Sequence, residues 1–148
     1  MKRLALLAVA GVLLAGCGGS GRLSKSAYEQ RIQTDGNTVQ KQVTALTKTA
    51  PTSLAQFAQR VDAAEAAVKK AADDLASLKP PSDAAVDNAA VVTALRAIQA
   101  ALERVKANPT GAEAIVTKLE KSPELKAAEK ATADLKQKGY KVGVIGAP

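Results

Sequence analysis

Four apolar stripes with helical spacing, separated by prolines, constrain the fold of this chain more than any other feature. The second stripe is close to a strict heptad, and the third repeats every 3.5 residues on average. Their members are Leu54, Phe57, Val61, Ala64, Val68, Ala71, Leu75 and Leu78, then Val91, Leu95, Ile98, Leu102 and Val105. Such spacing places apolar side chains on one face of a helix, which is buried against another helix. The sequence therefore predicts an all-α fold.

Prolines and capping residues mark where the helices begin and end. Pro51, Pro80 and Pro109 separate four segments of about 25 residues each, and Ser122-Pro123 restarts the fourth. The predicted N-caps are Ser26, Ser53 (with Thr52 as the alternative start), Asp83, Thr110 and Ser122. Equal lengths with short connections favour antiparallel neighbours, hence an up-down-up-down four-helix bundle. An elongated pair of helical hairpins is the alternative.

The interior is predicted to be solid. The chain contains 32 alanines, and its only aromatic residues are Tyr28, Phe57 and Tyr140. Alanine favours helix and lets helices approach closely. Ligand pockets are mostly lined by large apolar and aromatic groups, which are scarce here.

The first 16 residues have the layout of a signal peptide. Met1-Lys2-Arg3 is basic, and 4–14 is an uncharged apolar run of eleven residues. A run of this length is too short to span a bilayer as a helix, which needs about 20 residues. The alternative, an N-terminal helix of a cytosolic protein, would need a polar face that this segment lacks.

The chain has one cysteine, Cys17, preceded by Leu14-Ala15-Gly16. This tetrapeptide resembles the lipobox of bacterial lipoproteins. The resemblance implies that the Cys17 sulfur receives a diacylglyceryl group and that cleavage makes Cys17 the new N-terminus. The protein would then be exported and lipid-anchored on the extracytoplasmic face of the cell membrane, or to the outer membrane in a diderm. Two acyl chains give durable membrane attachment.

The predicted organisation is a signal peptide at 1–16, a lipidated tether at 17–23, a helical domain at 24–138 and a tail at 139–148. Gly139 is the predicted C-terminal stop of the last helix. The tail has a weak strand-like alternation from Tyr140 to Ile145. It is expected to lie over the bundle, and a partner-binding strand is the alternative.

Removing residues 1–16 leaves 132 residues with 19 basic and 14 acidic side chains, a net charge of +5. This excess serves solubility or attracts an anionic envelope polymer or lipid headgroups. Nucleic acid is not a predicted partner, since basic residues interleaved with aromatics are missing.

Catalytic residues are scarce. There is no histidine, Cys17 is assigned to lipid, and no phosphate-binding loop is present, so no cofactor or metal site is predicted. Asp73 and Asp74 are adjacent, so on a helix they point about 100° apart and do not converge. Asp62 and Glu65 share a face but are expected to be surface charges. The protein is predicted not to be an enzyme.

One polar interruption, Asp35-Gly36-Asn37, breaks the first stripe. Glycine in a helix interior costs about 1 kcal/mol relative to alanine, and functional sites often break local rules in this way. The simpler interpretation is a kink or a helix boundary.

The segments LSKSAYEQRIQTDGNTVQ, LKPPSDAAVDNAAVVTALRAIQAAL and KGYKVGVIGAP are similar to small, largely uncharacterised lipoproteins of high-GC Gram-positive bacteria. Many of those have cysteines in the first helix, which this chain lacks, so no disulfide is implied. The resemblance implies a fold and a source, but no activity. The sequence thus predicts a non-enzymatic envelope lipoprotein that presents helices to another envelope component, such as an envelope protein. A binding module for a lipid or small hydrophobic ligand is the alternative.

Overall fold

The computed structural model describes residues 21–48 and 51–143. These residues form five α-helices and no strand, which confirms the all-α prediction. The helices are α1 (Lys25–Thr47), α2 (Leu54–Ser77), α3 (Ala85–Ala107), α4 (Ala112–Glu120) and α5 (Pro123–Gln137). Short 3-10 turns, η1 (Ser82–Ala84) and η2 (Pro109–Gly111), precede α3 and α4. The fourth predicted segment is therefore two helices, and it restarts at Ser122-Pro123 as predicted.

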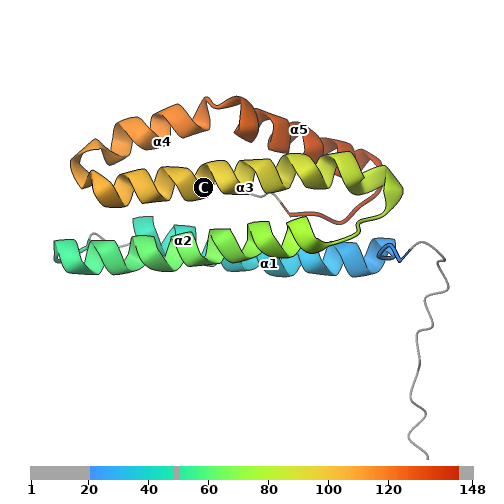
Figure 1. Cartoon of the computed structure of the whole chain (residues 1–148), viewed down its shortest axis with the longest axis horizontal. Coiled ribbons are helices and arrows are strands. Elements are labelled where there is room, and N and C mark those ends of the chain that lie inside the picture. Colours follow the sequence, from blue (N-terminus) through green and yellow to red (C-terminus); the bar gives the residue numbers. More distant parts are fainter. Residues whose placement is uncertain (1–20, 49–50, 144–148) are drawn as a thin grey trace, which may run out of the picture.

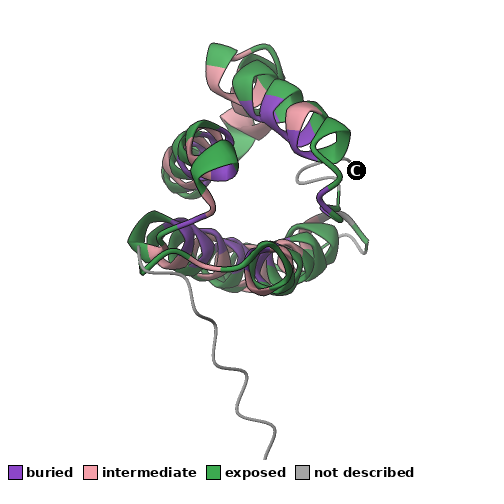
Figure 2. Cartoon of the chain, turned by 90° about the vertical axis from the view of Figure 1, so that its right-hand side faces the viewer, coloured by how far each residue is buried: buried purple, intermediate pink, exposed green. Residues whose placement is uncertain are grey.

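The helices run roughly along one long axis, with α3 at the centre (Figure 1). α3 packs against α2 on one side and against α4 and α5 on the other, while α1 packs against α2. Seen along the axis, the buried positions face a common interior (Figure 2). Within the described residues, α1 has no extensive contact with α4 or α5. The segment after α5 passes between α5 and α1 on this side (Figure 2).

The heptad positions of α2 and α3 supply about half of the core cluster. The largest fully buried side chains include Val61, Val68 and Leu75 of α2 with Val91 and Leu95 of α3. Burial of such side chains stabilises the fold by roughly 1.5–3 kcal/mol each. The first stripe position of α2 departs from the pattern, because Leu54 is exposed at the beginning of the helix.

Two of the predicted caps are confirmed. Ser53 Oγ accepts a hydrogen bond from Gln56 N at 3.1 Å, and Ser122 Oγ accepts one from Leu125 N at 3.3 Å. These bonds satisfy amides that have no partner within the first helical turn. Gly139 follows α5 with φ +75°, as the predicted stop requires.

The other three predicted caps are wrong. Thr110 lies within η2, which Asn108 caps, and its hydroxyl donates to Asn108 Oδ1 at 2.9 Å. α1 is capped by Ser24, whose Oγ accepts from Ala27 N at 3.3 Å, so the helix begins before Ser26. α3 has no side-chain cap because η1 leads directly into it. The Asp83 carboxylate is engaged by Tyr140 of the C-terminal segment instead.

Among the described residues, one helical stretch, Ser82–Ala107, is long and apolar enough to cross a membrane by length and composition alone. In this fold it is the central helix of the bundle, and its buried side chains pack against α2 and α5. Packing within the protein buries 39% of its most apolar window.

Candidate functional site

The residues of the predicted lipid anchor, Cys17 with Leu14, Ala15 and Gly16, lie outside the described residues. Lipidation and the signal peptide therefore stay predictions. The first described residues belong to the predicted tether, and they are fixed to the α2–α3 connection. Leu23 N donates to Lys79 O at 2.8 Å, and the Arg22 guanidinium donates to Pro80 O at 2.9 Å.

Asp35, Gly36 and Asn37 lie within α1, which continues without interruption from Lys25 to Thr47. The expected helix boundary at these residues is therefore wrong. Asp35 is buried, with 9% of its surface exposed, whereas Asn37 is exposed. The polar interruption in the stripe places a carboxyl group inside the fold.

Burial of Asp35 has an electrostatic cost. Its Oδ2 has no hydrogen-bond partner among the described residues. Burial raises the pKa of Asp35 above its usual value, and the nearby Asp74 raises it further, while Lys70 and Arg31 act in the opposite direction. The Asp74 carboxylate is paired with the Lys70 ammonium. The carboxylate that acts on Asp35 is therefore itself engaged by a lysine.

A buried tyrosine links three helices at the end of the bundle near residue 21. The Tyr28 side chain of α1 is 0% exposed, and its hydroxyl donates to Asn88 Oδ1 of α3 at 3.1 Å. Asn88 Nδ2 donates in turn to Leu75 O, near the end of α2, at 3.0 Å. Burial raises the pKa of Tyr28, since it penalises the phenolate. This chain of bonds fixes the helices in position and keeps the hydroxyl protonated.

The second tyrosine of this region comes from the C-terminal segment. The rings of Tyr28 and Tyr140 meet edge to face, with centroids 5.8 Å apart. The Tyr140 hydroxyl donates to Asp83 Oδ1 at 2.7 Å, and the Lys25 ammonium lies 4.6 Å from the ring centroid. Burial and the bond to Asp83 raise the pKa of Tyr140 to about 12. Edge-to-face and cation–π contacts each add about 0.5–1 kcal/mol or more.

Hydrogen bonds on both sides of Tyr140 hold the C-terminal segment. Lys138 Nζ donates to Asp87 Oδ2 at 2.6 Å, and this bond raises the pKa of the lysine. Lys141 N donates to Glu29 Oε1 at 2.9 Å, and Gln33 Nε2 donates to Lys141 O at 2.6 Å. Residues 138–143 thus lie along α1, which confirms for these residues the expectation that the tail covers the bundle. Residues 144–148 lie outside the described part.

The polar groups around Tyr28 and Tyr140 are hydrogen-bonded to one another. This arrangement is suited to anchoring the C-terminal segment on the bundle. No motif or spacing in the sequence groups Tyr28, Asn88 and Tyr140 as one site. Their one signal is composition, because two of the three aromatic residues of the chain meet here.

Three of the four carboxylates considered for catalysis, Asp62, Asp73 and Asp74, are paired with lysines. Asp73 pairs with Lys69 at 2.6 Å, and this bond lowers the pKa of the carboxyl group. Asp62 pairs with Lys106 across α2 and α3.

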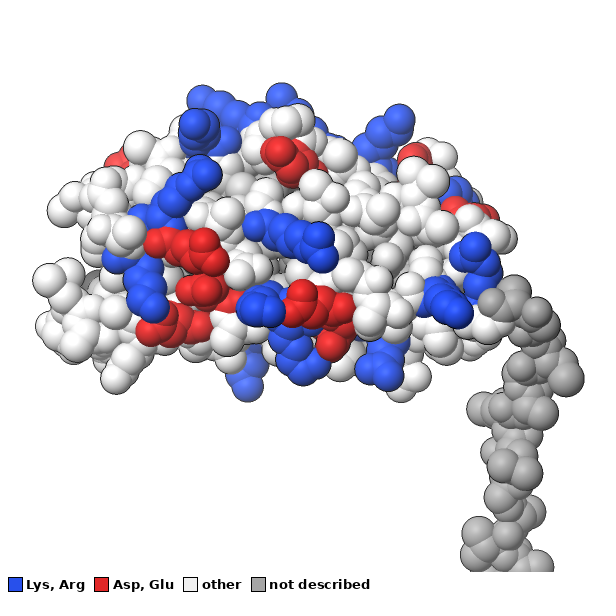
Figure 3. Space-filling model, in the orientation of Figure 1, with Lys and Arg blue, Asp and Glu red and all other residues white. Residues whose placement is uncertain are grey.

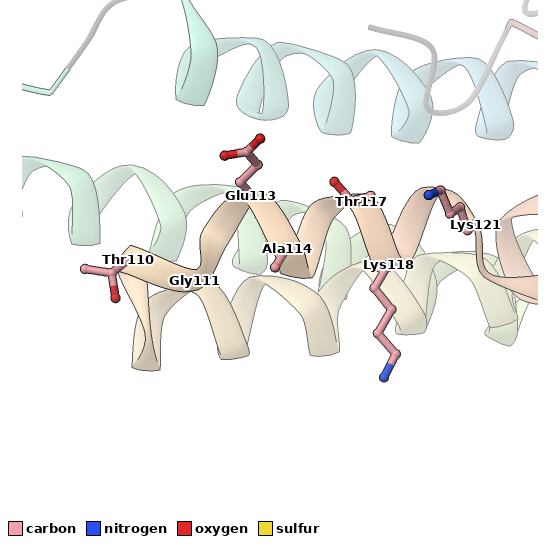
Figure 4. A pocket seen from close by; sticks show the side chains of 7 residues that line it. All are labelled: Thr110, Gly111, Glu113, Ala114, Thr117, Lys118 and Lys121. Carbon is pink, nitrogen blue, oxygen red and sulfur yellow. The ribbon is translucent and has the colours of Figure 1, made fainter.

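A depression of about 540 Å³ runs along the outer side of α4 (Figure 4). Its lining comes from one continuous segment: Thr110, Gly111, Glu113, Ala114, Thr117, Lys118 and Lys121. The half-buried Ile115 and Leu119 of α4 are not part of this lining. Because one continuous segment supplies the whole lining and all but one of these residues are exposed, the depression does not enclose a ligand.

Across residues 21–48 and 51–143, no group of three metal-ligating side chains is found. No family model matches the chain, and neither a curated protein nor a solved structure is significantly similar to it.

Proposed function

We propose that the protein is a lipid-anchored lipoprotein of the bacterial cell envelope that presents a helical surface to another envelope component. The motif Leu14-Ala15-Gly16-Cys17 carries the proposal. Cleavage before Cys17 would remove no residue that the structure describes, since the described part begins at residue 21.

The proposal includes an up-down-up-down four-helix bundle, in which α4 and α5 together take the place of the fourth helix. The support is the order of packing, from α1 to α2 to α3 and then to α4 and α5. The short break at Lys121-Ser122 lets α4 and α5 together bend along α3 (Figure 1).

A structural role without catalysis is favoured by the state of the carboxylates. Asp62 and Asp73 are paired with lysines on exposed faces, and the carboxylate that acts on the buried Asp35 is itself engaged by a lysine. The alternative function, a binding module for a hydrophobic ligand between the helices, has less support. The depression that the described residues form lies outside the bundle, along α4.

The test is the mass of the full chain after expression in a bacterium that processes lipoproteins. We expect loss of residues 1–16 and an added diacylglyceryl mass on Cys17, with the protein in the membrane fraction. Cys17→Ser should carry no lipid and be released from membranes once the leader is removed, whereas Ser20→Ala should behave as the natural chain. A Cys17→Ser protein that stayed on membranes after leader cleavage would refute the anchor.

A further inference from the structure

Three segments meet at the end of the bundle from which the chain leads back to Cys17. We call residues 21–26, 78–84 and 136–141 the tether end. They are joined by the bond from Leu23 N to Lys79 O, by that from Arg22 to Pro80 O, and by the bond from Lys25 Nζ to Lys138 O at 2.8 Å. The tether end is thus one surface with a fixed arrangement.

Basic side chains are denser at the tether end than over the rest of the domain. Its basic residues are Arg22, Lys25, Lys79, Lys136, Lys138 and Lys141, and all six are exposed. Three acidic residues lie at this surface: Asp83 within it, Asp87, which pairs with Lys138, and Glu29, which accepts a hydrogen bond from Lys141 N. The net charge there is therefore +3, and the other described residues, with 13 basic and 11 acidic side chains, contribute +2. Figure 3 shows the difference on one face, with basic side chains next to the first described residues and both signs mixed elsewhere.

We infer that the tether end rests on anionic lipid headgroups, so that the bundle stands on the membrane with its α1–α2 and α3–α4 connections pointing away. The inference rests on the proposed lipid anchor and names the surface that the anchor brings to the membrane. Cys17 and Gly21 are four residues apart, a span of at most about 14 Å when extended. Exposed charges act over about 8 Å at physiological ionic strength, and lysine side chains add to this reach.

A lipid headgroup is the occupant that this geometry selects. A phosphate-bearing wall polymer has similar chemistry, but it would meet any exposed part of the domain. Only the tether end is held next to the bilayer by the length of the chain. Basic clusters beside a membrane anchor are attracted to anionic lipids and add to the hold of the acyl chains.

The test compares lysine reactivity in the full, processed chain reconstituted into vesicles. One set of vesicles contains phosphatidylcholine alone, and the other contains phosphatidylcholine with phosphatidylglycerol. A water-soluble amine-acylating reagent is added, and mass spectrometry follows each lysine. Lys79, Lys136 and Lys141 report on the tether end, while Lys41, Lys118 and Lys126 are exposed controls elsewhere.

We expect the three tether-end lysines to react about fivefold more slowly in the anionic vesicles, which is the factor expected for an ordinary lysine–headgroup contact. The difference should vanish at about 1 M salt, where charges act over only about 3 Å. The control lysines should react equally in both vesicles. In Lys79→Gln/Lys136→Gln/Lys141→Gln, the protection of Lys25 and Lys138 should also fall. The matched Lys41→Gln/Lys118→Gln/Lys126→Gln, with the same net charge, should retain it.

Several outcomes would overturn the inference. Equal reactivity in the two vesicles, with the lipid present on Cys17, would reject the headgroup contact and leave the proposed anchor standing. Slower reaction at the control lysines as well would mean that the bundle lies flat. Stronger protection by soluble polyphosphate than by anionic vesicles would assign the surface to a polymer. A Cys17 without lipid would refute the anchor, and the inference with it.

Discussion

The two ends of the bundle are built differently. At the tether end, Tyr28 and Tyr140 are buried against each other, and hydrogen bonds join α1, α2, α3 and the C-terminal segment. At the opposite end, where α1 connects to α2 and α3 to α4, α4 has no buried residue. Val43 and Val116 are 38% and 45% exposed there.

This difference shows how an alanine-rich bundle can concentrate its specific contacts. Small side chains bring helices together but contribute little apolar area each, so a few large residues determine where packing is tight. We expect the opposite end to open more readily than the tether end, since local stability follows buried apolar contact.

The largest test of this comparison is removal of the C-terminal segment. A chain ending at Gly139 loses Tyr140 and Val142, both of which are buried. At roughly 1.5–3 kcal/mol for each buried side chain, the free energy of unfolding should fall by about 3–6 kcal/mol. Urea denaturation followed by circular dichroism measures the loss.

A chain ending at Gly143 is the matched control, because it retains every described contact of the segment. It should unfold at nearly the urea concentration of the full chain. If both truncations had the same small effect, residues 140–143 would not stabilise the side of the bundle between α1 and α5.

The next largest effect is expected from Tyr28→Ala. The ring is fully buried, and truncation of a large aromatic side chain in a core typically costs about 3–5 kcal/mol. Phe57→Ala, near the opposite end, should cost clearly less, because Phe57 is only partly buried. Urea unfolding of the two variants compares the ends directly, and equal losses would show that packing is even along the bundle.

The sequence was sufficient to predict the helices and their core faces. Val61, Val68, Leu75, Val91 and Leu95 lie at heptad positions, and all five are fully buried. Prediction from apolar periodicity succeeds here because the buried face of a helix depends only on the spacing of residues within that helix, about 25 residues long. The caps at Ser53 and Ser122 could be predicted for the same reason, since a cap bonds an amide only three residues away.

The tether end could not be predicted in the same way. Tyr28 meets Asn88 and Tyr140, which are 60 and 112 positions away, and no periodicity encodes such a pairing. Asp83 shows the conflict most clearly. Its local position favours a helix cap, but its carboxylate bonds to the Tyr140 hydroxyl. A long-range partner thus overrode the local preference.

The gathering of basic side chains at the tether end also depends on long-range contacts. Along the sequence, Arg22, Lys79 and Lys141 belong to separate segments with no common motif. Only the fold brings these segments to one surface, so net charge alone could not indicate where the basic side chains would gather.

Between the two ends, the buried Asp35 should lower the stability of the chain relative to a variant with an apolar residue at this position. Asp35→Leu removes a buried oxygen without a partner, so the free energy of unfolding at pH 7 should rise by about 1–3 kcal/mol. Asp73→Leu, at an exposed carboxylate of α2, should give no comparable gain.

The pH dependence of Asp35 provides a second measurement. Its pKa is higher in the folded chain than in the unfolded chain, so the folded state binds this proton more tightly. Its contribution to stability therefore falls as pH rises from the ordinary carboxyl value through the folded pKa. In Asp35→Leu this decline should disappear from urea midpoints measured across that interval. An unchanged pH profile would show that Asp35 has no raised pKa in the folded state.

The smallest change in stability is expected from a substitution in α4, because this helix has no buried residue. Val116 is about half exposed, so Val116→Gln removes little buried apolar area and should change the free energy of unfolding by less than about 0.5 kcal/mol. Amide hydrogen exchange sharpens the test, because the amides of α4 should exchange by local opening while those around Tyr28 exchange only on global unfolding. Equal protection of the two regions, or a large loss in Val116→Gln, would mean that a contact of α4 outside the described residues stabilises this end.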